Sequence, residues 1–182
     1  SYTLSSGTLI GDLAVLFGLK SRGTYRTLSN IEILKIPAIL FKEFVNRNKL
    51  LNQLQKTLEA IEFLQQTWLF GESISSPIQC QIAQSLTLAK FKKGEKIECD
   101  GLMLVKEGKV ELSSRGKDKT ESQNVVGKGD FWGGEKMNSS EAKCSYAKAI
   151  TQTMIYSITD IEILRQIPII RWKLLEHSEK RE

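Results

Sequence analysis

A glycine-bearing stretch near the C-terminal end of the chain, residues 129–158, has a second and weaker copy near the start. Gly129 and Gly133 lie 122 residues after Gly7 and Gly11 (129 − 7 = 133 − 11 = 122). The same offset aligns four apolar residues with four others: Leu28, Ile33, Ile36 and Ile39 with Ile150, Ile155, Ile158 and Ile161. Because a fixed period is typical of repeated units, the sequence predicts two copies of one unit: a glycine turn, a short helical or irregular segment, an apolar strand and a helix.

The glycine turns have the chemistry to bind an anion. Glycine lets the backbone approach a ligand closely, and the start of a helix leaves N–H groups without intrahelical partners. The alternative is that these glycines only form tight turns in a β-barrel. The repeat itself favours the anion-binding interpretation.

Size, charge and cysteine content exclude several classes of protein. The 182 residues, of which 41% are hydrophobic, allow one complete core and part of a second. The net charge of +5 is a mild excess, and the lysine-rich segments 90–96 and 115–119 indicate solvated turns, so nucleic acid is not an expected partner. Three widely spaced cysteines indicate reduced thiols in a cytoplasmic protein, with neither a disulfide framework nor a metal site. No apolar run is long enough to span a membrane.

The patterns of apolar residues predict short strands between helices. Strands are expected at residues 24–28, 31–36, 87–91, 96–99, 102–105, 109–112, 124–126 and within 146–158, with a hairpin turn at 107–109 and a polar loop at 115–123. Helices are expected at 38–66, at 77–86 with Ser76 as N-cap, and at 159–177. Many short strands with regular turns predict an antiparallel β-roll over residues 87–158.

Three motifs resemble the cyclic nucleotide-binding domain family: residues 91–97 (FKKGEKI), 102–112 (LMLVKEGKVEL) and 129–133 (GDFWG). The resemblance implies a mainly β fold with flanking helices, an antiparallel β-roll of the jelly-roll type, a phosphate-binding cassette between the sixth and seventh strands, and a C-terminal hinge helix. It covers about residues 60–178. Residues 1–37 resemble only the C-terminal part of a first roll, 38–66 a hinge or linker helix, and 67–182 a second domain. Since half a roll leaves apolar faces unpaired, we expect residues 1–37 to pack on the second domain or on another chain.

The resemblance also implies the ligand, cAMP or cGMP, and its site; no other cofactor is expected. In the family a Glu binds the ribose hydroxyl, and an Arg nine residues later binds the cyclic phosphate. The first copy has Asp for that Glu, and the second has Lys for that Arg, with its acidic residue displaced by one position. The candidate ligand-binding residues are Gly11, Asp12, Ser21 and Arg22 in the first copy and Gly133, Gly134, Glu135, Lys143 and Cys144 in the second.

These departures leave several functions open. The first is a regulatory sensor module of a larger signalling protein, in which nucleotide binding is weak or lost because Lys lacks the two-pronged geometry of Arg. The second is a structural or protein-interaction module, with an output domain or a second copy of the chain as partner. The third is a fragment of a DNA-binding regulator, although the chain ends at Glu182 without a helix-turn-helix. An enzyme is not expected, because His177, interpreted as a solvated tail residue, has no catalytic set around it.

Overall fold

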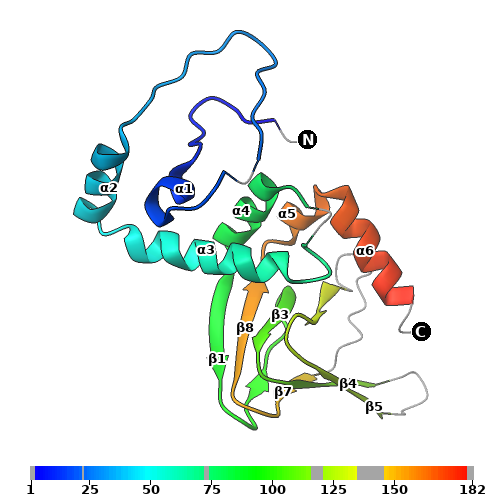
Figure 1. Ribbon diagram of the computed structural model, residues 1–182. Helices are drawn as coiled ribbons and strands as arrows, with labels where there is room; N and C mark the ends of the chain where they lie inside the picture. Colours follow the sequence, from blue (N-terminus) through cyan, green and yellow to red (C-terminus); the bar gives the residue numbers. More distant parts are fainter. Residues whose placement is uncertain (1–2, 22, 72–73, 116–120, 135–145, 180–182) are drawn as a thin grey trace.

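The chain folds into a β-roll of two antiparallel four-stranded sheets with helices gathered at one end (Figure 1). This computed structural model describes residues 3–21, 23–71, 74–115, 121–134 and 146–179. The helices are α1 (Asp12–Phe17), α2 (Ala38–Arg47), α3 (Leu51–Gln65), α4 (Ser76–Ser85), α5 (Ile161–Arg165) and α6 (Pro168–Glu179). The strands are β1 (Thr87–Phe91), β2 (Lys96–Ile97), β3 (Leu102–Glu107), β4 (Val110–Arg115), β5 (Glu121–Val126), β6 (Phe131–Trp132), β7 (Tyr146–Ala149) and β8 (Thr153–Ile158).

The strand order is that of a roll. One sheet runs β1-β8-β3-β6 and the other runs β2-β7-β4-β5, and every pairing is antiparallel. Strand β8 lies in the interior of the first sheet, between β1 and β3, and β7 lies in the interior of the second, between β2 and β4. The predicted antiparallel β-roll over residues 87–158 is therefore confirmed, and β1 has the predicted bounds.

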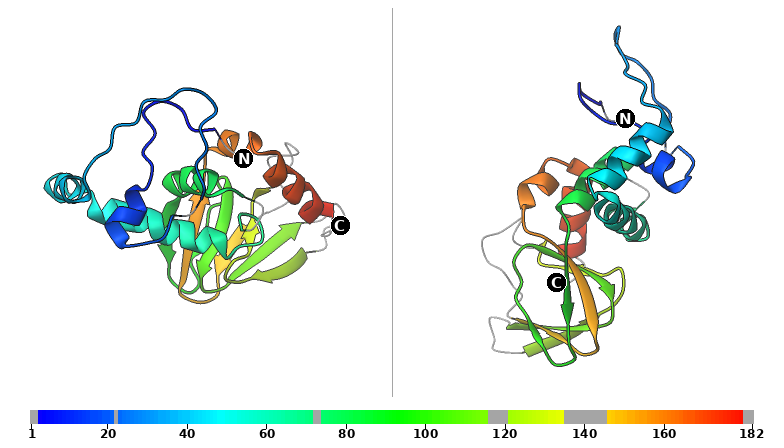
Figure 2. Two further views of the ribbon diagram at one scale, coloured as in Figure 1. Left: turned by 45° about the horizontal axis from the view of Figure 1, so that its top comes forward. Right: turned by 90° about the vertical axis from the view of Figure 1, so that its left-hand side faces the viewer.

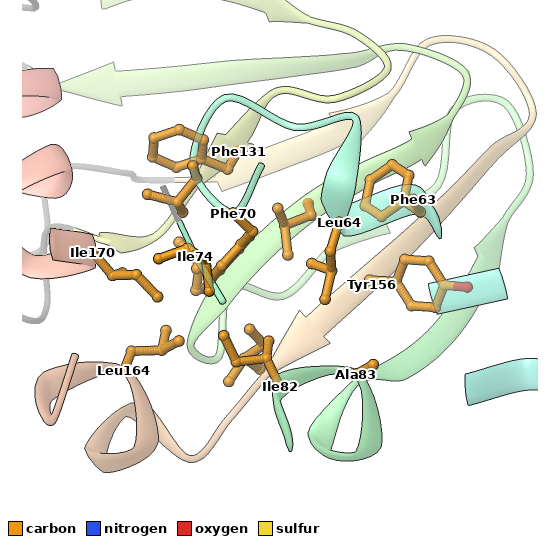
Figure 3. Close-up of a cluster of buried hydrophobic side chains, with 14 of the residues drawn as sticks. Phe63, Leu64, Phe70, Ile74, Ile82, Ala83, Phe131, Tyr156, Leu164 and Ile170 are labelled. Atoms are coloured by element: carbon orange, nitrogen blue, oxygen red, sulfur yellow. The ribbon is translucent and has the colours of Figure 1, made fainter. Parts of the chain in front are cut away.

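In the first sheet, residues 102–105 of β3 are buried on both faces. Successive side chains of a strand point to opposite faces, so Met103 and Val105 pack into the core between the sheets, while Leu102 and Leu104 pack against the helices. This double burial is why residues 102–105 form a continuous apolar run instead of an alternating one. Figure 3 shows the helical side of this core, where side chains of β6, β8, α3, α4, α5 and α6 meet: Phe131, Tyr156, Phe63, Leu64, Ile82, Ala83, Leu164 and Ile170.

The turn at 107–109 does not form the predicted hairpin. Strands β3 and β4 belong to different sheets, with β3 paired to β6 and β8 and β4 paired to β5 and β7. The chain crosses between the sheets beside the β7–β8 turn, and Gly108 has a φ of +91°. A Cβ there would lie 2.5 Å from the Gln152 carbonyl oxygen, so the glycine is required by this crossing, not by a hairpin.

Both long predicted helices are broken in two. The helix expected at 38–66 stops at Asn48, whose side-chain amide donates to the Phe44 carbonyl 2.8 Å away, and Lys49 then adopts a φ of +55°. The helix expected at 159–177 is divided before Pro168, which lacks the N–H needed to continue α5.

Two smaller predictions are also corrected. Helix α4 begins at Ser76, so Ser75 is its N-cap residue, and β5 begins at Glu121, inside the predicted polar loop.

The N-terminal strands predicted at 24–28 and 31–36 are absent from the described chain. Apart from α1, the described residues up to Pro37 are irregular, and Figure 2 shows them running outside the roll. Leu28, Ile33 and Leu34 are 79%, 71% and 94% exposed. Leu13 packs against the helical core, but for residues 24–36 the expected packing on the second domain is wrong. Packing on another chain stays a prediction.

We expect Leu104→Ala to lower the free energy of unfolding by about 2–5 kcal/mol, because Leu104 is fully buried in β3 and its truncation leaves a cavity. The matched control is Leu88→Ala in β1, where the side chain is 42% exposed and the cost should be about 0.5 kcal/mol. Urea denaturation measures both values. Equal costs for the two variants would contradict the placement of the core.

Candidate functional site

The candidate site in the second domain begins where β6 ends, at Gly133 and Gly134, which we call the glycine turn. Strand β6 pairs with β3, Phe131 opposite Leu104 and Trp132 opposite Met103. Trp132 is buried between the sheets, and its Nε1–H donates to Cys99 Sγ 2.9 Å away. The two residues of β6 thereby fix where the glycine turn leaves the roll.

Close backbone approaches hold the glycine turn in place. A Cβ on Gly133 would lie 2.2 Å from the Gly101 carbonyl oxygen, and a Cβ on Gly101 would lie 2.1 Å from the Ile158 carbonyl oxygen. Both glycines also have positive φ, +85° and +103°. Three chain segments, the end of β8, the start of β3 and the glycine turn, therefore pack so closely that only glycine fits between them.

Helix α6 lies directly against the glycine turn. A Cβ on Gly134 would lie 2.8 Å from Leu174 Cδ2 and 3.5 Å from Leu102 Cδ1. Leu174 belongs to α6 and is buried in the helical core. The structure therefore joins the end of β6 to the C-terminal helix without an intervening layer. The other predicted residues of this copy lie outside the described residues: Glu135, Lys143 and Cys144.

Aromatic rings extend the contact between β6 and α6. The Phe131 ring lies 4.4 Å from the His177 ring and is stacked with Trp68, with centroids 6.2 Å apart and an angle of 2° between the planes. The interpretation of His177 as a solvated tail residue is therefore wrong: α6 carries it back onto the roll, where it is half-buried.

Lys173 ties α6 to the connection that follows α3. Its ammonium group donates to the Trp68 carbonyl oxygen 2.6 Å away and lies 5.2 Å from the centre of the Trp68 ring. The residue is only 7% exposed, so this buried cation has carbonyl oxygens and a ring face as its described partners.

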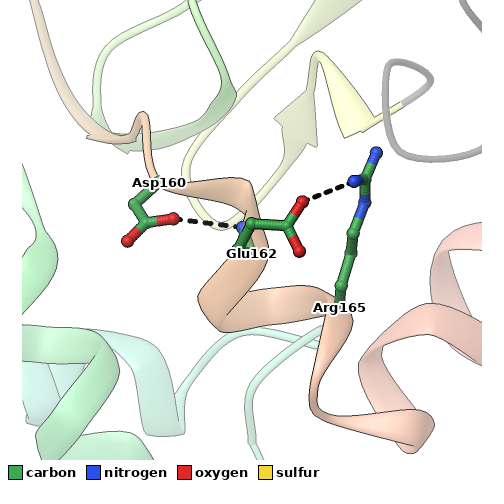
Figure 4. A network of polar contacts seen from close by, with 3 residues as sticks. All are labelled: Asp160, Glu162 and Arg165. Atoms are coloured by element: carbon green, nitrogen blue, oxygen red, sulfur yellow. Dashed lines mark hydrogen bonds and ion pairs between the residues drawn. The ribbon is translucent and has the colours of Figure 1, made fainter.

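Helix α5 connects β8 to α6 and is fixed by local polar contacts (Figure 4). Asp160 Oδ1 accepts the Glu162 backbone N–H at 3.1 Å, which caps the first turn. Glu162 forms an ion pair with Arg165 one turn later. Both side chains are exposed, so the pair contributes little to the stability of the protein.

The first copy also begins with a glycine of positive φ, but it lies in a different part of the fold. Gly11 has a φ of +84°, and Asp12 begins the six-residue helix α1. The Ser21 hydroxyl donates to the Gly23 carbonyl at 2.8 Å, and Arg22 lies outside the described residues. Figures 1 and 2 show α1 beside α2, apart from β6, so the described candidate residues Gly11 and Asp12 of the first copy do not lie at the glycine turn of the second.

In the described part of the chain, no three His, Cys, Asp or Glu side chains are grouped so that they could hold a metal ion. None of its helices is both long enough and apolar enough to cross a bilayer.

Sequence reasoning missed three residues that shape this site: Gly101, Trp68 and Leu174. Gly101 follows Asp100, and this Asp-Gly pair is a local turn signal from which Gly101 could have been identified. Trp68 and Leu174 lie 106 residues apart in the sequence (174 − 68), and both meet β6 only through the fold. No pattern of residues close together in the sequence predicts such a contact.

Comparison with known proteins identifies the fold. No model of a protein family matches the chain. A curated relative, the cGMP-dependent protein kinase isozyme 2 forms cD5/T2 of Drosophila melanogaster, is 22% identical over 181 residues, which cover 93% of this chain and 19% of the kinase. The forms cD4/T1/T3A/T3B are equally similar, with 16% of the kinase covered. The chain therefore spans less than a fifth of the length of these relatives.

Solved structures agree on the architecture. The regulatory domain of Toxoplasma gondii protein kinase A with cAMP matches with a TM-score of 0.61 and 14% identity, over 76% of this chain and 56% of that one. The regulatory subunit of a cAMP-independent protein kinase A from Trypanosoma cruzi, bound to guanosine, matches with a TM-score of 0.57 and 19% identity, over 76% and 53%. At these identities the likeness shows the fold, which is that of cyclic nucleotide-binding domains.

The backbone packing at the glycine turn makes a testable claim. Gly133→Ala should cost about 3 kcal/mol or more of unfolding free energy, since it adds strain at positive φ and a clash with the Gly101 carbonyl. Gly127→Ala is the matched control, because a Cβ there meets nothing within 4 Å, and it should cost about 0.5 kcal/mol or less. Urea denaturation followed by tryptophan fluorescence measures both, and a Gly133→Ala variant as stable as the control would refute the packing.

Proposed function

We propose that this chain is a regulatory module of a larger signalling protein, and that its second β-roll senses an anionic ligand of the cyclic nucleotide class. The contact between the glycine turn and α6 carries the proposal. Gly134 packs against Leu174, and Phe131 packs against His177, so a ligand that changes the path of the glycine turn changes the support under α6. The output of the module is then the position of that helix.

The ligand chemistry follows from what the turn offers. Backbone N–H groups at a glycine turn can hold a phosphate without a side chain, since no Cβ blocks their approach. In this proposal Lys143 supplies the cation and Glu135 the acceptor for a ribose hydroxyl, and Cys144 follows Lys143 directly in the sequence. The candidate ligands are cAMP and cGMP; several solved proteins of the same fold carry cyclic nucleotides, among them the Toxoplasma gondii regulatory domain with cAMP.

The runner-up is an interaction module of the same fold that binds no nucleotide. The observation in its favour is the Lys at position 143, which offers a point charge instead of the planar fork of a guanidinium. In that case α6 and the exposed N-terminal segment serve as contact surfaces for an output domain or a second copy of the chain. Titration with nucleotide separates the two functions.

Calorimetric titration with cAMP and with cGMP tests the sensor proposal. We expect Lys143→Ala to weaken binding by about a hundredfold or more, because a buried phosphate loses about 2–5 kcal/mol with its charged partner. Lys143→Arg should strengthen binding, since a guanidinium restores two-pronged contact. Lys148→Ala is the matched control: Lys148 is exposed on β7 and its removal should leave the affinity unchanged.

The interaction module is the correct function if neither nucleotide binds at millimolar concentration and Lys143→Arg does not create binding. Equal losses of nucleotide affinity in the Lys143→Ala and Lys148→Ala variants would indicate general electrostatic attraction and would also overturn the proposed site.

A further inference from the structure

The connection that follows α3 is irregular but buried. Thr67, Leu69 and Phe70 are at most 3% exposed, and residues 67–71 belong to neither a helix nor a strand. Buried backbone carbonyls need hydrogen-bond donors, and an irregular segment cannot obtain them from a helix or a sheet ladder. The donors for this segment therefore have to come from other parts of the fold.

Gln79 of α4 supplies the donor for the second half of the connection. Its Nε2 donates to the Phe70 carbonyl at 2.8 Å and to the Gly71 carbonyl at 3.2 Å. Its Oε1 accepts a hydrogen bond from the side-chain amide of Gln65, the last residue of α3, at 3.1 Å. Because Gln79 is only 4% exposed, one buried amide joins the end of α3, the connection and α4.

Lys173 of α6 supplies the donor for the first half. Its ammonium group donates to the Trp68 carbonyl and lies 3.5 Å from the Leu69 carbonyl oxygen. Neither carbonyl accepts another hydrogen bond from the described residues. No described carboxylate forms an ion pair with this lysine, so the two carbonyls and the Trp68 ring face are what allow a cation to be buried here.

The position of Lys173 on α6 is unusual for a lysine. It lies on the side of the helix that packs into the helical core, between Ile170 and Leu174, whereas its neighbour Trp172 is 57% exposed. A core-facing position of an amphipathic helix ordinarily carries an apolar residue, and lysine is almost never buried without a partner. The lysine at this position therefore indicates a role for its ammonium group.

We propose that Gln79 and Lys173 act together as a polar clasp, through which a displacement of α6 is passed to the C-terminal end of α3. If α6 moved alone, Lys173 would leave two buried carbonyls without a donor. Because unpaired buried carbonyls are unfavourable, the connection follows the helix instead. The Gln79 amide then transmits the shift to Gln65 and thereby to α3.

The roll holds α3 at a different point. Glu59, in the middle of α3, pairs with Lys106 of β3 at 3.7 Å, and the Lys106 ammonium also lies 5.2 Å from the centre of the Tyr156 ring. Lys106 sits where the register between β3 and β8 shifts, between Val105 and Glu107. The middle of α3 is thus anchored to the roll, so the polar clasp acts on the end of the helix, residues 61–65.

The polar clasp gives the module a second output. In the proposed function the position of α6 is the output, and the clasp adds α3, which leads back to α2 and the N-terminal copy. This use of the clasp rests on the proposed function. The coupling of the two helices does not, because its hydrogen bonds require no nucleotide.

Native-state hydrogen exchange in the nucleotide-free 182-residue chain tests the polar clasp. Lys173→Met removes the ammonium group and keeps an unbranched apolar side chain. We expect the amides of residues 61–66, as well as those of α6, to exchange at least about tenfold faster, while those in the centre of β3 keep their protection. Arg171→Met, at an exposed position of α6, is the matched control and should leave both helices at their original rates.

Gln79→Leu tests the same coupling in the reverse direction. The hydrogen bonds of the Gln79 side chain reach only α3 and the connection, so a purely local role predicts no change in α6. The polar clasp predicts exchange at least about tenfold faster in α6. The double variant should exchange about as fast as the faster single variant, since both substitutions disable one unit. Gln81→Leu, exposed on α4, is the matched control.

Two results overturn the proposal, and either variant decides alone if the other does not fold. A Lys173→Met variant with faster exchange in α6 but not in residues 61–66 would show that the lysine supports only its own helix. A Gln79→Leu variant in which α6 keeps its original rate would show that the two side chains act separately. A failure of nucleotide binding in calorimetry would overturn the proposed sensor and leave these exchange rates unchanged, so the two failures are distinguishable.

Discussion

Close packing of the backbone at the helical end of the roll sets how the first sheet, the glycine turn and α6 fit together. The end of β8, the start of β3 and the glycine turn meet at Gly101 and Gly133, where a single added methyl group would collide with a carbonyl oxygen. Because β8 and β3 are neighbours in the same sheet, this contact transmits the position of the sheet to the turn. Because Gly134 packs against Leu174, the position of the glycine turn also affects the position of α6.

Helices at both ends of the second domain are anchored to this region. Helix α3 reaches the roll through Phe63, whose ring lies 5.3 Å from that of Tyr156, and through Glu59, which pairs with Lys106 at 3.7 Å. The Lys106 ammonium also lies 5.2 Å from the centre of the Tyr156 ring. Helix α6 reaches the segment after α3 through Lys173. The connection after α3 is thus linked to α6, and α6 also lies against the glycine turn, which suits a module that relays a change in one element to its neighbours.

Elements whose structure depends on local pattern could be predicted from the sequence. The strands of the roll follow from turn residues and β-branched runs, and the double burial of β3 is visible in its continuous apolar run, residues 102–105. Features that depend on distant partners could not be predicted. Residues 31–36 have the pattern of a strand, but a strand needs neighbouring strands, and none pairs with this segment in the described part of the chain. The turn at 107–109 has the local signature of a hairpin, while the β7–β8 turn decides that the chain changes sheet there. The contact of His177 with Phe131 depends on the fold of the whole C-terminal half.

If the glycine turn controls α6, amide hydrogen exchange in α6 should respond to a Gly134→Val substitution. A valine at this position must displace Leu174, because even a Cβ would lie 2.8 Å from Leu174 Cδ2. We expect the amides of α6 to exchange at least about tenfold faster in the variant, while those in the centre of β3 and β8 keep their protection. An α6 that exchanges at the original rate in a variant with an intact roll would contradict the coupling of turn and helix.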